Sequence, residues 1–169
     1  MKKVIVGILM GLVVLSWPIQ VKANALSYIP PEDADGIPTE ITQYAEIIGG
    51  EFNICPELLE AIAFYESSYD PTVTNGNCKG LMQVNPSVHQ LRFEEAGWTT
   101  ADWSDAYKNM YVAADYLAEL FAEHEDVGIV LGIYHGESNA VEKGKSGNLS
   151  AYTKKILKRS EELEIAHGK

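Results

Sequence analysis

The strongest constraint on the fold is an apolar stripe of helical period in residues 105–124. Its members are spaced by three or four residues: Tyr107, Met110, Ala114, Leu117 and Phe121. Side chains at this spacing lie on one face of an α-helix, so the segment is predicted to be a long helix packed against a core. The stripe therefore indicates packing and not a ligand site.

Further helices are predicted in residues 39–48, 56–68, 80–90 with an interruption near Pro86, 127–134 and 150–165. The last is amphipathic, and its inward residues are Tyr152, Ile156, Leu157 and Leu163. The pair Gly49-Gly50 ends the first, and Pro56 suits the first turn of the second. Residues 127–134 are nearly all apolar and fit either a buried strand or a buried helix; their helical surroundings favour a helix. No internal repeat and no convincing alternation of period two is present. The chain is predicted to form a single, mostly α domain.

The first 25 residues have the order of a secretory signal peptide. Lys2 and Lys3 precede an apolar run in residues 4–17, and Ala23-Asn24-Ala25 offers a cleavage site. An uncleaved membrane anchor is the alternative, although the run is short for a bilayer span. The predicted organisation is a signal peptide in residues 1–25, an extended lead-in in 26–38 and the domain in 39–165. The protein is expected to be exported.

The charge is strongly acidic. The chain has 24 Asp and Glu against 13 Lys and Arg, a net charge of -11, which argues against nucleic acid as a partner. Removal of residues 1–25 takes away three lysines and no acid, so the remaining charge is -14. Long-range repulsion from anionic polymers is therefore expected.

Cysteine and histidine residues give two further expectations. Outside the cytoplasm Cys55 and Cys78 are expected to form a disulfide, with two free buried thiols as the alternative. The four histidines are too scattered to suggest a metal site: His89, His124, His135 and His167. No metal or organic cofactor is expected.

One glutamate lies on an apolar helix face. In residues 56–68 the stripe consists of Leu59, Ile62 and Ala63, and its next member is Glu66. Glu57 and Glu60 lie off this stripe and are expected to face water. A carboxyl held in an apolar wall has a raised pKa, which suits a general acid for glycosidic cleavage. The alternative is a helix-end glutamate that bends out to solvent.

Four motifs resemble those of the lytic transglycosylases with the soluble-transglycosylase (SLT), lysozyme-like fold. Residues 66–71, Glu-Ser-Ser-Tyr-Asp-Pro, are similar to the first motif, and residues 80–86, Gly-Leu-Met-Gln-Val-Asn-Pro, to the second. Asn109-Met110 followed by Tyr116-Leu117 resembles the third. Residues 131–136, Leu-Gly-Ile-Tyr-His-Gly, resemble the fourth. The motifs occur in the family's order between residues 39 and 157, which implies a lysozyme-like fold.

The resemblance implies roles for several residues. Glu66 matches the single catalytic acid/base, and Gln83 matches a residue that binds the sugar, although it could instead satisfy local backbone groups. Met82 matches a residue of the groove floor, with plain core packing as the alternative. Tyr134 matches a tyrosine whose hydroxyl approaches the catalytic glutamate, with a half-buried core aromatic as the alternative. Ser67 is placed among the substrate-binding residues, where it orients the adjoining loop.

The chain departs from the family at His135, where an asparagine is usual. A histidine that bonds only backbone would serve as well, whereas one that touches substrate could change specificity or pH response. The departure concerns the wall of the groove more than the chemistry.

The reaction implied is cleavage of the bond between N-acetylmuramic acid and N-acetylglucosamine in peptidoglycan. Glu66 protonates the bridging oxygen and then deprotonates the C6 hydroxyl of the muramic acid, which closes a 1,6-anhydro ring. Three alternatives remain: a hydrolytic lysozyme-type muramidase, which would need a placed water and a second carboxylate; a non-catalytic wall-binding or assembly subunit; and a membrane-anchored scaffold.

Overall fold

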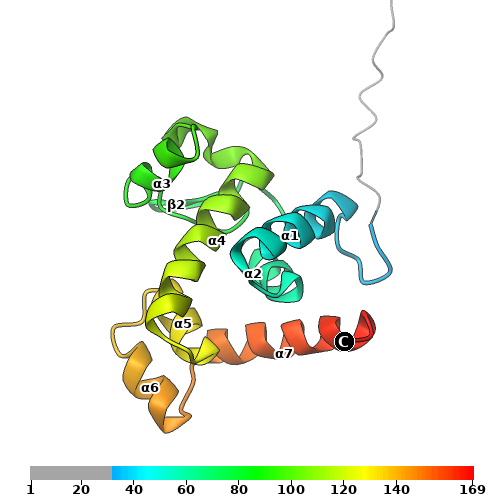
Figure 1. Ribbon diagram of the computed structural model, residues 1–169, viewed down its shortest axis with the longest axis vertical. Coiled ribbons are helices and arrows are strands. Elements are labelled where there is room, and N and C mark those ends of the chain that lie inside the picture. Colours follow the sequence, from blue (N-terminus) through cyan, green and yellow to red (C-terminus); the bar gives the residue numbers. More distant parts are fainter. Residues whose placement is uncertain (1–31) are drawn as a thin grey trace, which may run out of the picture.

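The computed structural model describes residues 32–169, which are mostly helical (Figure 1). The helices are α1 (Thr39–Phe52), α2 (Pro56–Ser67), α3 (Gln90–Glu95), α4 (Ala106–Glu123), α5 (Val127–Tyr134), α6 (Ala140–Ser146) and α7 (Ala151–Ala166). A 3-10 turn (Thr100–Ser104) and two short antiparallel strands, β1 (Thr74–Asn75) and β2 (Cys78–Lys79), complete the secondary structure. The predicted signal peptide and the start of the lead-in lie outside the described residues.

The described part of the lead-in turns back on itself. Glu32 pairs with Pro38 in an isolated antiparallel bridge, and a carboxylate oxygen of Asp33 accepts hydrogen bonds from the backbone of Asp35 and Ile37. Ile37 is fully buried. This short turn therefore packs against the domain that follows it.

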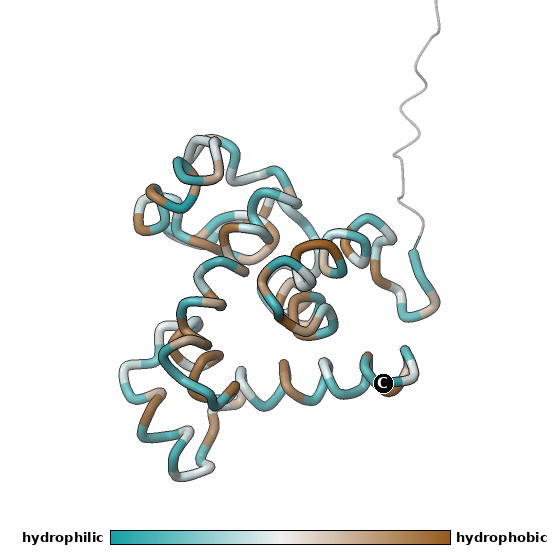
Figure 2. Tube along the Cα trace, viewed as in Figure 1, coloured by the Kyte–Doolittle hydropathy of each residue, from teal (hydrophilic) through white to brown (hydrophobic). Residues whose placement is uncertain are grey.

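Helix α2 is the centre of the packing. It contacts α1, α4 and α7, and Figure 1 places it between α1 and α7. Figure 2 shows hydrophobic segments where these helices meet, and the core includes the side chains of Leu59, Ile62, Met110, Leu117 and Ile156. Because α2 is surrounded, nearly every residue from Glu57 to Ala63 is removed from solvent.

The predicted helices agree with the structure where the apolar period is long. The stripe of residues 105–124 becomes α4, with Met110, Ala114 and Leu117 fully buried. The apolar run of residues 127–134 is a helix, as predicted, and α1 continues through the glycine pair to Phe52. The helix predicted in residues 80–90 is wrong: this segment consists of turns, and α3 begins only at Gln90.

The expectation that Glu57 and Glu60 face water is wrong. Their exposed fractions are 1% and 0%. Helix α7 packs along α2 and covers the face that a two-sided helix would leave in solvent. The prediction assumed a single apolar face, which holds for a surface helix and not for one surrounded by neighbours.

The predicted disulfide is absent: Cys55 and Cys78 are both free thiols. Cys55 precedes the first residue of α2, whereas Cys78 lies beside Glu66, near the other end of the helix. A helix of 12 residues is about 18 Å long, while bridged cysteines need Cα atoms within about 7 Å. The fold therefore separates the two thiols, and the Cys55 Sγ donates instead to Glu57 Oε2 at 2.9 Å.

Within residues 32–169 no helix combines the length and apolar character needed to cross a bilayer.

Candidate active site

Glu66 lies in the last turn of α2 and borders a groove. Burial raises the pKa of its carboxyl, while a hydrogen bond from Tyr152 and the nearby His135 act in the opposite direction. The Tyr152 hydroxyl, at the start of α7, donates to Glu66 Oε1. The side chain is therefore partly removed from solvent, as the helix stripe predicted, and has one fixed polar partner. A carboxyl with a raised pKa holds its proton to higher pH than a free one and can release it to a neighbouring oxygen.

Tyr152 is itself fixed by His135. The two rings are stacked, with centroids 3.7 Å apart and planes 13° from parallel. His135 follows α5 directly and lines the groove. The family's asparagine is thus replaced by a ring that supports the partner of Glu66.

The Tyr134 hydroxyl is directed elsewhere than the resemblance implied. It donates to the Met82 carbonyl at 2.7 Å, and the tyrosine that bonds Glu66 is Tyr152. Tyr134 still lines the groove, and burial together with the charge of Glu66 raises its pKa well above the usual value. Its hydroxyl therefore stays protonated and holds the loop that carries Met82.

A buried asparagine holds the same loop from the other side. Asn109 Oδ1 accepts from the Met82 backbone N–H at 2.8 Å, and Nδ2 donates to the carbonyls of Lys79 and Trp103. Gly80 has a φ of +83°, and a Cβ there would lie 2.2 Å from Asn109 Nδ2. Only glycine allows this approach. Asn109, from the third motif, thus fixes the second motif beside Glu66.

In the side-chain amide of Gln83 the nitrogen makes hydrogen bonds and the oxygen makes none among the described residues. Its Nε2 donates to the carbonyls of Val73 and Gly80, which agrees with the alternative that it satisfies local backbone. Its Oε1 is buried without a partner among the described residues, and Gln83 lines the groove. The backbone φ of +50° is uncommon for a residue with a side chain. The free Oε1 can accept a hydrogen bond from a sugar hydroxyl or amide.

Ser67 and Met82 have positioning roles. Ser67 Oγ donates to the carbonyls of Leu81, at 2.7 Å, and Ala63, and its exposed fraction is 7%. The Met82 side chain is fully buried in the core and does not border the groove. Ser67 thus connects the Glu66 helix to the loop that carries Met82. Neither residue lines the groove, and a role of either in substrate binding stays a prediction.

The groove beside Glu66 has a volume of about 410 Å³. Its lining is mostly uncharged and comes from α2, the hairpin and its following loop, α4 and the end of α5: Glu66, Asn75, Cys78, Gln83, Val84, Asn85, His89, Tyr116, Ile133, Tyr134, His135 and Gly136. Glu66 is the one carboxylate among these described residues. A second carboxylate, which most glycosidases use as a base or as a nucleophile, is therefore not found among the described residues of this lining.

No sequence pattern indicates the role of Tyr152. Its helical period placed it correctly on the inner face of α7, but an inward tyrosine is usually a core residue. Only the fold brings it to Glu66, across a separation of 86 residues. Near this site the described residues contain no cluster of His, Cys, Asp and Glu that could hold a metal ion.

Comparison with known families gives one match. Residues 43–157 match the model of the transglycosylase SLT domain, which has a lysozyme-like fold. The matched range contains all four motifs and every residue that lines the groove, and it ends within α7. A search of curated proteins gave no match.

Proposed function

The chain belongs to the transglycosylase SLT domain family, and from that premise we propose that it is a peptidoglycan lytic transglycosylase with Glu66 as its single acid/base. Members of the family are generally peptidoglycan-acting lyases of the cell wall. The observation that carries the proposal is the placement of Glu66. Glu66 is partly buried and accepts a hydrogen bond from Tyr152, and it is the one carboxylate that lines the groove among the described residues.

In the first step Glu66 acts as an acid. The raised pKa of its carboxyl favours the protonated form, which donates its proton to the oxygen bridging N-acetylmuramic acid and N-acetylglucosamine. The bond between that oxygen and C1 of the muramic acid breaks. Glu66 becomes a carboxylate, which the Tyr152 hydroxyl stabilises by its hydrogen bond.

In the second step the same carboxylate acts as a base. It removes the proton from the C6 hydroxyl of the muramic acid, and that oxygen bonds to C1. The product is a 1,6-anhydro sugar, Glu66 is reprotonated, and no water is consumed. A single carboxylate is sufficient because the substrate supplies its own nucleophile.

The groove supplies orientation. The free Oε1 of Gln83 offers an acceptor beside Glu66, and His135 holds the Tyr152 ring by stacking. We extend the proposal to export by cleavage of residues 1–25, since the substrate is outside the cytoplasm. Local placement by a secretion or conjugation apparatus is a further part of the proposal, supported by the acidic overall charge.

The experiment that tests the proposal is mass spectrometry of glycan fragments after digestion of purified peptidoglycan. We expect 1,6-anhydro-muramyl products from the wild type and none from Glu66→Gln. The matched control is Glu60→Gln, which removes a carboxylate from the same helix but not from the groove, and which should retain activity.

Two outcomes would contradict the proposal. Products with ordinary reducing ends would identify a hydrolase and require a second carboxylate. No release of fragments by a folded wild type that still binds peptidoglycan would favour a wall-binding subunit.

A further inference from the structure

The charges of the chain are segregated along its length. Residues 32–139 contain three basic and 20 acidic residues, a formal charge of -17. Residues 140–169 contain seven basic and four acidic residues, a formal charge of +3. The overall acidity therefore describes most of the domain but not its last 30 residues.

The three basic residues of the acidic part already have partners. Arg92 pairs with Asp115 and Glu119, Lys108 pairs with Asp102, and the Lys79 ammonium lies 5.4 Å from the centre of the Trp103 ring. Their charges therefore interact with side chains of the same domain. The positive charge that remains available for another molecule lies on the last two helices.

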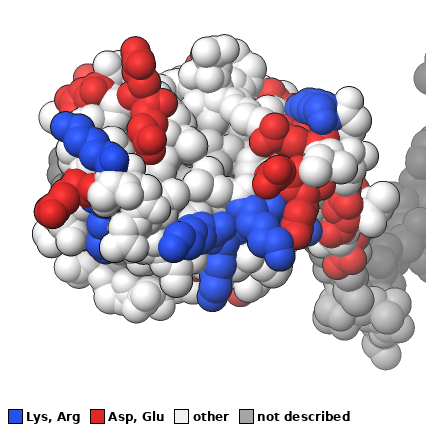
Figure 3. Space-filling view, turned by 90° about the horizontal axis from the view of Figure 1, so that it is seen from below, with Lys and Arg blue, Asp and Glu red and all other residues white. Residues whose placement is uncertain are grey.

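Three lysines form an exposed face of α7, here called the α7 basic face: Lys154, Lys155 and Lys158. Lys158 follows the other two by four and three residues, so it neighbours each of them on the helix surface, and all three are exposed. Figure 3 views the molecule from the side of α7, and Lys and Arg side chains cross the middle of this face. No ion pair among the described residues involves Lys154 or Lys155, while Lys158 lies 3.5 Å from Glu162.

The order of charges along α7 opposes helix stability. Basic residues stabilise the C-terminal end of a helix and acidic residues the N-terminal end. In α7 the lysines come first and the acids Glu161, Glu162 and Glu164 follow, with no acid in the first turn. The arrangement thus lowers the stability of the helix, which points to a role outside the fold.

The α7 basic face starts at the active site. Lys155 follows Tyr152 by one helical turn, on the same side of α7, and Tyr152 bonds Glu66. A peptide of four residues spans about 13 Å when extended. A peptide attached to a sugar in the groove can therefore reach these lysines.

We propose that the α7 basic face binds the carboxylates of the peptide stems that peptidoglycan carries on its muramic acid residues. The inference rests on the proposed function, because it takes a glycan strand in the groove as its starting point. The face acts as an electrostatic attachment site beside the cleavage point and offsets the repulsion of the acidic part.

A wall polymer fits this face better than a lipid surface. The exposed positions of the face carry lysine and lack the Trp, Phe or Leu side chains that insert into a bilayer. Acidic residues follow directly along the same helix and would meet the same negative plane. A flexible stem can contact the lysines alone.

The test is a binding assay with the purified chain carrying Glu66→Gln, so that the polymer stays intact. Binding to sedimented peptidoglycan sacculi is compared with binding of a variant that adds Lys154→Gln, Lys155→Gln and Lys158→Gln. A second variant replaces the same lysines with arginine and keeps the charge. Sacculi with carboxyl groups converted to amides serve as the uncharged substrate, and vesicles of anionic phospholipid as the alternative surface.

We expect the glutamine variant to bind intact sacculi roughly tenfold more weakly at low ionic strength, the arginine variant to bind normally, and amidated sacculi not to distinguish the three proteins. Thermal unfolding verifies that each variant is folded. Equal binding of the glutamine variant and its parent to intact sacculi would overturn the proposal, and so would lysine-dependent binding to vesicles alone.

The proposed function and this inference fail separately. If binding depends on the lysines but the wild type forms no anhydro products, the attachment site is supported and the proposed activity is rejected. If anhydro products form but the lysines do not affect binding, the activity is supported and the attachment site is rejected.

Discussion

Among the glutamates of helix α2, Glu60 and Glu66 are in opposite circumstances. Glu60 is fully buried, and neither of its oxygens has a hydrogen-bond partner among the described residues. Glu66 is partly buried, receives a hydrogen bond from Tyr152 and faces a groove. Burial raises the pKa of both, that of Glu60 to about 7. The comparison teaches that a raised pKa alone does not mark a catalytic acid; access and a positioned partner do.

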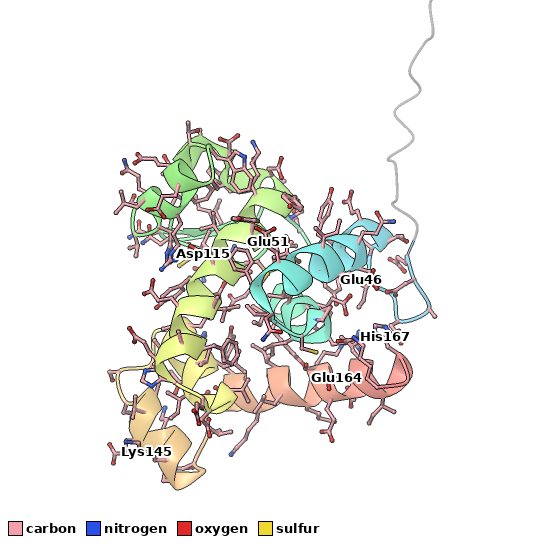
Figure 4. All side chains as sticks on the ribbon, in the orientation of Figure 1. Glu46, Glu51, Asp115, Lys145, Glu164 and His167 are labelled. Atoms are coloured by element: carbon pink, nitrogen blue, oxygen red, sulfur yellow. The ribbon has the colours of Figure 1, made fainter. Side chains whose placement is uncertain are left out.

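The surroundings of Glu60 form a second charged region at the end of α7. His167 lies between α7 and the α1–α2 pair in Figure 4, with Nδ1 2.8 Å from Glu57 Oε1 and Nε2 3.3 Å from Asp35 Oδ2. Although burial acts to raise it, hydrogen bonds from Cys55, Lys169 and His167 lower the pKa of Glu57 to about 2. The Glu57 carboxylate therefore has hydrogen-bond partners, whereas the Glu60 carboxyl, one turn away, has none among the described residues.

The largest expected difference between the two glutamates is in activity. Glu66→Gln removes the transferable proton and should reduce the rate of peptidoglycan cleavage roughly 10³-fold, while Glu60→Gln should change it less than twofold. Release of soluble fragments at pH 6 measures both. Similar losses in the two folded variants would mean that the groove is not the site of chemistry.

The second expected difference is in stability. The folded pKa of Glu60 is raised from 4.5 to about 7, so the stability it contributes is complete below pH 4.5 and is lost as pH rises through 7. Glu60→Gln imitates the protonated form at every pH. It should increase the free energy of unfolding by about 3 kcal/mol at pH 8 and very little at pH 4.5.

Urea unfolding of wild type and Glu60→Gln at the two pH values measures this effect. A gain that does not depend on pH would show that the pKa of Glu60 is the same in the folded and unfolded states, and would contradict this prediction. Glu66→Gln serves as the comparison on the same helix.

The sequence predicted the burial of Glu66 but not that of Glu60. The stripe through Leu59, Ile62 and Ala63 correctly placed Glu66 against an apolar wall, and the motifs identified the family. Burial of Glu60 could not be predicted, because it depends on α7 covering the second face of α2. The contact lies about 100 residues away in sequence, and periodicity within α2 carries no information about it.

The same reason explains the other differences. Residues 127–134 were predicted to be buried from their apolar composition and helical from their helical surroundings, whereas α6 and the turns of residues 80–90 lack a strong period. Tyr152 was predicted to face inward, but its bond to Glu66 exists only after α7 has docked. The disulfide was predicted from the oxidising compartment expected of an exported protein. That reasoning took no account of the helix that separates the two cysteines.

A third prediction concerns the partner of Glu66. Tyr152→Phe removes a hydrogen bond that lowers the pKa of Glu66, so that pKa should rise. Because the general acid must be protonated, the limb on which kcat/KM falls with rising pH should move to higher pH. Activity at the optimum should fall about tenfold, since a hydrogen bond to a charged group is lost.

The pH dependence of kcat/KM on a soluble glycan distinguishes this role from simple packing. An unchanged profile with reduced activity would assign Tyr152 to the fold alone. Tyr134→Phe is the matched control: it removes a hydroxyl that bonds the Met82 carbonyl and should leave the limb in place.

The smallest effect is expected from His167. Its hydrogen bond with Glu57 raises the pKa of His167, so its contribution to stability is complete below pH 6.5 and is lost as pH rises through the raised value. His167→Gln should lower the free energy of unfolding by about 1 kcal/mol at pH 6 and by less at pH 9. Thermal unfolding at the two pH values measures the difference, and a loss that is equal at both would exclude an ionic contribution.

The hydrogen bond between Tyr152 and Glu66 also joins residues that are synthesised at different times. Glu66 leaves the ribosome 86 residues before its partner. A partly synthesised chain therefore holds the Glu66 carboxyl without its tyrosine partner. The hydrogen bond between them forms only after the final helix has packed against α2, so the proposed acid/base receives its partner after every residue that lines the groove has been synthesised.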